Sequence, residues 1–185
     1  MKGILIVLLA GAMGLSVLAI EQRGLRVHYR ADQKLSAQEA TELVELALRI
    51  VDRKQPTPER KAAARRIGIH LPHKAAIPAL LRIVRDSKDN EDVRYWALTA
   101  LSQIADNSVI TLLIDTLKDR APNIRARADE QLKKLAGWKS PHSISVYRQD
   151  ISAKELDLAV SSWRQWWKNT QPKFKFDRIR VLGEY

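Results

Sequence analysis

The chain has 185 residues, of which 45% are hydrophobic and 29% charged, a composition typical of a folded globular protein rather than a disordered one. It contains no cysteine, which excludes disulfides, thiolate metal sites and cysteine nucleophiles. Its 32 Lys and Arg against 21 Asp and Glu give a formal net charge of +11. This balance favours an acidic partner such as nucleic acid, anionic lipid or an anionic envelope polymer, although a generically basic surface would have the same composition.

The N-terminus has the pattern of an export signal. Lys2 precedes an uncharged stretch over residues 3–20, and Ala19 ends a small-residue sequence typical of a cleavage site. Residues 1–19 are therefore predicted to be a signal peptide. Arg23, Arg26 and Arg30 follow closely and disfavour translocation, so an uncleaved membrane anchor over residues 3–20 remains the alternative. Both alternatives predict a protein that is periplasmic, secreted or anchored at the outer face of a membrane.

An internal repeat follows. Residues 86–104 and 119–135 align at a spacing of 31 residues. The equivalent positions are Val93 and Ile124, Arg94 and Arg125, Ala97 and Ala128, and Leu101 and Leu132. A weaker copy lies 34 residues before Arg94, where Arg60 takes the same place. Each copy has apolar residues at three- and four-residue steps, which predicts helix pairs over roughly residues 36–70, 73–105 and 107–136.

Residues 76–106 read AIPALLRIVRDSKDNEDVRYWALTALSQIAD, with paired leucines, an acidic turn, Val-Arg, and then Ala and Leu or Ile at four-residue steps. This pattern resembles a HEAT-like repeat of the bilin-lyase type, over residues 36–136. The resemblance implies an all-α fold, namely a short right-handed α-solenoid of about three HEAT-type helix pairs with a Trp-rich C-terminal capping helix. It implies little about chemistry, because one fold serves many functions.

A recurring arginine and a recurring acid are predicted to form a structural ladder rather than a catalytic row. The ladder residues are Asp52, Arg60, Asp86, Arg94, Asp119 and Arg125. The resemblance implies that the turn acid and the helix arginine hydrogen-bond within and between units.

The segment 152–169 is predicted to be a helix that covers the last repeat. Leu156, Val160, Trp163 and Trp167 share one helical face, which indicates packing. The structural cap consists of Trp163, Trp166 and Trp167, whose alternative role is a ligand-stacking platform. The Trp-x-x-Trp-Trp element resembles the tail of exported bacterial repeat proteins.

The remaining boundaries follow from the cap and the repeats. They give an N-terminal arm at residues 20–35, a repeat domain at 36–136, a loop at 137–151, the capping helix at 152–169 and a tail at 170–185. Residues 24–30 and 173–181 alternate apolar and polar side chains, as extended arms or free tails would.

No catalytic motif is present: the chain lacks a His-Glu-x-x-His sequence, a Gly-rich phosphate loop and a Gly-x-Ser-x-Gly elbow. His70 and His73 are separated by Pro72 and have no carboxylate at metal-ligand spacing. We expect no catalytic residue, no cofactor and no metal.

The sequence therefore predicts a non-enzymatic scaffold or adaptor that acts outside the cytoplasm and binds a protein or an anionic envelope component. The candidate partner-binding residues are Arg60, Arg65, Arg66, Lys74, Arg127, Lys133 and Lys134. One alternative is a basic protein that binds nucleic acid or another polyanion, but an export signal argues against nucleic acid. Others are a membrane-anchored assembly factor and a lyase or hydrolase that uses a histidine and the aromatic tail. The oligomeric state is left open.

Overall fold

The computed structural model describes residues 34–104 and 106–176. The predicted signal peptide or anchor, most of the N-terminal arm and residues 177–185 of the tail lie outside these described residues. Within them the chain forms seven α-helices and two short 3-10 turns, and no strand. The helices are α1 (Ala37–Val51), α2 (Thr57–His70), α3 (Ile77–Arg85), α4 (Glu91–Gln103), α5 (Asn107–Thr116), α6 (Pro122–Leu135) and α7 (Ala153–Thr170).

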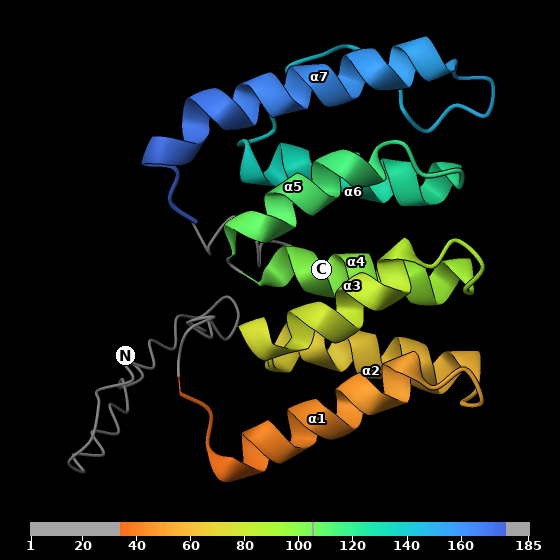
Figure 1. Ribbon diagram of the computed structural model, residues 1–185, viewed down its shortest axis with the longest axis vertical. Helices are drawn as coiled ribbons and strands as arrows, with labels where there is room; N and C mark the ends of the chain where they lie inside the picture. The colour runs from red at the N-terminus through yellow and green to blue at the C-terminus, as the bar shows by residue number, and fades with distance from the viewer. Residues whose placement is uncertain (1–33, 105, 177–185) are drawn as a thin grey trace, which may run out of the picture.

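The helices stack as three successive pairs, α1–α2, α3–α4 and α5–α6, along the long axis of the molecule (Figure 1). Helix α7 lies at the opposite end of the stack from α1, against the last pair. The second helices α2, α4 and α6 pack on one another in sequence, with the most extensive contact between α2 and α4. The predicted all-α solenoid of three helix pairs with a Trp-rich helix at its C-terminal end is confirmed.

Side-chain caps fix where several helices begin. Ser36 and Glu39 form a reciprocal capping box at the start of α1, and Ser152 and Glu155 form another at the start of α7. At α4 the Asn90 side chain accepts hydrogen bonds from the backbone N–H groups of Asp92 and Val93. These caps satisfy donors that have no partner within the helix.

Small residues allow the second helices to approach closely. Ala97 and Ala128, the equivalent positions of α4 and α6, are both fully buried. Between α2 and α4 the approach is tighter still, because a Cβ added at Gly68 would lie 2.9 Å from the Cα of Ala100. Glycine is therefore required at residue 68 for its lack of a side chain, and the close packing excludes water from the spine.

A buried arginine in α2 and another in α4 link neighbouring units. Arg60 of α2 donates from Nε to the Ile50 carbonyl at 2.8 Å and from both terminal nitrogens to Asp89 at 2.7 and 2.6 Å. Arg94 of α4 repeats this arrangement one unit later, since it donates to the Val84 carbonyl and to Asp119. Each guanidinium thus joins the first helix of its own pair to the turn of the next pair.

The third arginine, Arg125 of α6, has no following repeat. Its guanidinium donates instead to the backbone carbonyls of Val146 and Arg148, at 2.6 and 2.7 Å, and to those of Asp119 and Arg120. The loop between α6 and α7 therefore takes the place of the next unit, and Val146 is fully buried there.

The structure brings together only part of the predicted ladder. Of the predicted acids, Asp119 accepts a hydrogen bond from the ladder arginine Arg94. The acid that accepts from Arg60 is Asp89, which is not among the predicted ladder residues. Asp52 caps the first turn by accepting from the Lys54 N–H and the Gln55 amide. Asp86 has the equivalent place in the next turn, where it accepts from the Lys88 N–H and pairs with Arg53.

Burial raises the pKa of Asp89, but the hydrogen bonds from Arg60 and from the Asn90 N–H lower it by more, so the net pKa lies below the ordinary value. The carboxylate is therefore ionised at neutral pH and depends on its arginine for compensation, because both side chains are about 5% exposed or less.

We predict that Arg60→Ala lowers the free energy of unfolding by about 3–5 kcal/mol, because it leaves the Asp89 charge buried without a partner. The double variant Arg60→Met/Asp89→Leu should lose markedly less, since it removes both charges while retaining volume. Urea denaturation of the two variants and the wild type measures both values. Equal losses in the two variants would show that packing, not the ion pair, dominates at this position.

Candidate interaction surface

Four side chains form a continuous row across the second helices, in which two neighbouring aromatic rings are flanked by an arginine at each end. The guanidinium of Arg65, on α2, lies 5.3 Å from the ring centroid of Trp96, on α4. Trp96 meets Tyr95 edge to face at 5.8 Å, and Arg127 of α6 lies 4.9 Å from the Tyr95 ring. We call Arg65, Trp96, Tyr95 and Arg127 the arginine–aromatic row; these geometries are those of cation–π and T-shaped pairs.

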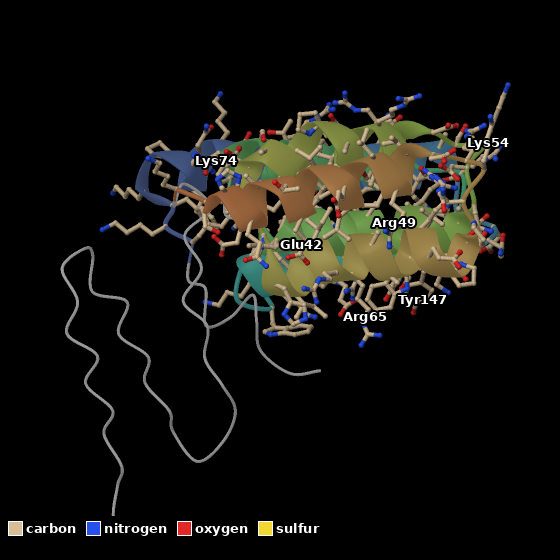
Figure 2. The ribbon with its side chains drawn as sticks, turned by 90° about the horizontal axis from the view of Figure 1, so that it is seen from below. Glu42, Arg49, Lys54, Arg65, Lys74 and Tyr147 are labelled. Carbon is tan, nitrogen blue, oxygen red and sulfur yellow. The ribbon has the colours of Figure 1, made fainter. Side chains whose placement is uncertain are left out.

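The arginine–aromatic row is open to solvent at one end and buried at the other. Arg65 is exposed, and Figure 2 shows it projecting away from the ribbon on the same side as Tyr147. Tyr95 and Trp96 are partly buried, whereas Arg127 is only 4% exposed. Arg127 donates to the Thr99 hydroxyl at 2.8 Å and to Glu130 at 2.7 Å, so it anchors the row rather than offering its charge to a partner.

The two aromatic residues were missed by the sequence reasoning, although the repeat contains a signal for them. After the ladder arginine, α2 continues with Lys61 and Ala62, and α6 with Ala126 and Arg127. Only α4, the central unit, places two aromatic rings at these positions. Because both rings are only partly buried and have no aromatic counterpart in the neighbouring units, this departure from the repeat indicates a role beyond packing between units.

Six of the seven predicted partner-binding residues have a carboxylate within 4.0 Å. The pairs are Arg60–Asp89, Arg66–Glu42, Lys74–Asp106, Arg127–Glu130, Lys133–Asp129 and Lys134–Glu130. Arg65 differs, because its guanidinium stacks on Trp96. The basic candidates are thus distributed over several helices and are largely neutralised, rather than gathered into one uncompensated patch.

Glu130 shows how this neutralisation works. Burial raises the pKa of this carboxyl, but hydrogen bonds from Lys134 and Arg127 outweigh it, and the resulting pKa is below the ordinary value. The carboxylate therefore remains ionised and holds two of the predicted cations.

A groove separates α3 from α5. It encloses about 310 Å³ and is lined by apolar residues of both helices, with Leu101 of α4 also contributing. The lining residues are Ile77, Leu81, Arg85, Leu101, Ser108, Val109, Thr111, Leu112 and Asp115. On either side of the groove the packing is closer, since α1 packs on α3 and α5 packs on α7. Between α3 and α5 the packing is weaker, because the groove lies there.

The three cap tryptophans gather at the last repeat. Trp163 is fully buried and Trp167 is 8% exposed, while Trp166 is partly buried between them. Trp166 and Trp167 also meet Phe174 edge to face, at 6.1 and 5.2 Å. The rings therefore pack against the stack and against the chain that follows α7, while Trp166 also lines an open hollow beside Pro141 and Gln165.

A buried histidine fastens the loop to this end of the stack. His142 accepts a hydrogen bond at Nδ1 from the Ile144 N–H, and its Nε2 lies 3.7 Å from Asp129. Asp129 also accepts from the Trp163 indole at 3.3 Å and pairs with Lys133 at 2.5 Å. Burial lowers the pKa of His142, an effect that nearby Lys133 reinforces and Asp129 opposes. The imidazole is consequently neutral at pH 7.

No three His, Asp or Glu side chains within residues 34–104 and 106–176 gather closely enough to hold a metal ion. His70 and His73, weighed in the sequence as a metal pair, lie at the end of α2 and at the turn before α3. In the same described segments, no helix has both the length and the apolar character needed to cross a membrane.

In a comparison with protein families, residues 44–133 match a family described as HEAT repeats. The matched segment runs from α1 to α6 and contains both linked arginine–aspartate pairs. No curated protein and no solved structure compared with the chain matches it. The likeness to HEAT repeats agrees with the three stacked helix pairs and extends to no particular activity.

We predict that acidification from pH 7.5 to 5.5 destabilises the protein partly through His142. The folded-state pKa of His142 is lowered, so the unfolded state binds the proton more readily, and stability falls as the pH drops below the unfolded value of about 6.5. His142→Gln can still accept the Ile144 N–H bond but does not titrate. Denaturant titrations at the two pH values should show a smaller pH-dependent loss in this variant; an unchanged loss would contradict the prediction.

Proposed function

We propose that this protein is a non-enzymatic scaffold or adaptor whose second-helix face binds a protein partner through the arginine–aromatic row. HEAT repeats commonly mediate protein–protein interactions, and the match over residues 44–133 supports this general role. The observation that carries the proposal is the partly exposed arrangement of Arg65, Trp96 and Tyr95 across α2 and α4.

The chemistry of the arginine–aromatic row suits a protein partner. Arg, Trp and Tyr are the residues most often found at the energetic centres of protein interfaces. Here the rings are held in place by the buried guanidinium of Arg127, so little side-chain entropy is lost when a partner covers them. The partner expected is a surface with an apolar or aromatic group to pack on Trp96 and a carboxylate to meet Arg65.

An anionic polymer is the second candidate, favoured by the net charge of +11. The ion pairs argue against it, because six of the seven predicted basic residues already have a carboxylate partner. A polyanion site needs several cations free to neutralise phosphate or similar groups together. We therefore place the protein partner first.

We further propose that the protein acts outside the cytoplasm, as an exported repeat protein of bacterial type. The support is the sequence of residues 1–20, in which an apolar stretch follows Lys2 and ends in a candidate cleavage site at Ala19. The bilin-lyase-type repeat pattern belongs to the same proposal. Catalysis has no part in it, because the sequence contains no recognised catalytic motif.

Affinity capture with three forms of the protein tests the interaction. The wild type and the control Leu158→Ala, which alters an exposed apolar residue on α7, should capture the same partner. Trp96→Ala should reduce capture at least tenfold, as the loss of an interface centre of about 2 kcal/mol implies. If the partner is captured equally by all three forms, it binds elsewhere and the arginine–aromatic row is not the site.

Fractionation of cells that express the chain with a C-terminal tag tests the location. We expect the protein in the envelope or secreted fraction, and Ala19→Arg should retain an uncleaved form if residues 1–19 are a signal peptide. Recovery of the wild type in the cytoplasmic fraction would contradict export while leaving the interaction surface untouched.

A further inference from the structure

The outward face of α1 is apolar, and no other residue among those that the structure describes covers it. Ala37, Ala40, Val44 and Leu48 fall within an arc of about 80°, because successive helical residues are about 100° apart. Val44 is 59% exposed and Leu48 is 62% exposed. The opposite face of α1 is buried against α2 and α3 through Leu43, Leu46 and Ile50. We call Ala37, Ala40, Val44 and Leu48 the α1 stripe.

The two ends of the stack differ in this respect. At the C-terminal end, α7 lies against the last pair and buries Trp163 and Trp167 there. At the other end, α1 is the last described element, and in Figure 2 that end faces the viewer with Arg49 in front. Solenoid proteins cover the apolar surface at both ends of the stack, because a terminal unit exposes the face that a further unit would cover.

The charges beside the α1 stripe form a self-complementary pattern. Glu45 and Arg49, both exposed, lie one turn apart along the same edge of the stripe. Neither has an ion-pair partner among the described residues, whereas the neighbouring Glu42 pairs with Arg66. When two such helices pack antiparallel about a two-fold axis, the same edges meet, and Val44 falls opposite Leu48 of the second copy. The same register places Glu45 beside the second copy's Arg49, and the reciprocal pair forms by symmetry.

We propose that the α1 stripe is a dimer interface, in which α1 packs antiparallel on α1 of a second copy of this chain. The apolar stripe supplies the contact, and the two symmetric Glu45–Arg49 pairs set its direction and register. A parallel arrangement would bring this edge against the opposite, uncharged edge of the stripe and leave both charges without partners. The dimer leaves α2, α4 and α6 free, so a dimer would present two copies of the arginine–aromatic row.

Sedimentation equilibrium of the full chain tests the dimer. One helix pair is a small interface, so we expect reversible association with a dissociation constant on the order of 10–100 µM. Glu45→Lys and Arg49→Glu should each weaken the dimer roughly tenfold or more, because each turns two attractions into two repulsions. The double variant Glu45→Lys/Arg49→Glu restores opposite charges across the axis and should dimerise like the wild type. Leu158→Glu, an exposed apolar position on α7, is the matched control and should have no effect.

The chain has no native cysteine, so Val44→Cys/Leu48→Cys provides an independent measure of register. Mild oxidation should link the two copies, and the same treatment of Leu158→Cys should not. Circular dichroism of each variant verifies that the helices are intact. A wild type that stays monomeric at 500 µM, for example because residues before 34 cover α1, would overturn the proposal. A dimer that is insensitive to all α1 variants would overturn it equally, because association would then use another surface.

Discussion

The buried arginine that reaches from one helix pair to the turn of the next is the interaction on which this stack depends. Arg60 and Arg94 each hold two backbone or carboxylate groups that lie in different units. Buried apolar residues such as Val93, Ala97 and Leu101 supply the packing between units, yet such contacts tolerate small shifts between helices. A planar guanidinium with fixed donor directions tolerates such shifts poorly. The arginines therefore restrict how far each unit is displaced along the stack from its neighbour.

Most of the architecture was predictable from the sequence because the repeat is a physical pattern. An alanine at one helical position and a leucine or isoleucine four residues later recur in each second helix, and this recurrence predicts the buried spine. The ladder was harder to predict. The turn between α3 and α4 contains two acids, Asp86 and Asp89, and only the three-dimensional path of the turn decides that Asp89 receives Arg60. The partners of Arg125 are backbone carbonyls in a loop, and carbonyls leave no trace in a side-chain pattern.

The candidate site was predicted less well, and for a related reason. A count of basic residues cannot show which of them are neutralised, because the partner carboxylate often comes from a neighbouring helix, as Glu42 does for Arg66. Arg127 illustrates a second difficulty. Its counterpart in α2, Ala62, is exposed. The α4–α6 interface, however, contains the buried polar side chains of Thr99, Ser102 and Gln131 beside its apolar residues, and the Arg127 guanidinium turns inward to hydrogen-bond with Thr99. The contact between the Arg127 guanidinium and the Tyr95 ring depends on this inward position, so it could not be predicted from the sequence.

The groove between α3 and α5 also affects the mechanics of the molecule. On this side of the stack the groove lies between the first helices of the second and third pairs, while α4 packs on both α5 and α6. An unfilled groove offers less packing to be lost or compressed than a filled interface does. We therefore expect a change in the curvature of the stack to be accommodated at the boundary between the second and third pairs more readily than at the boundary between the first and second.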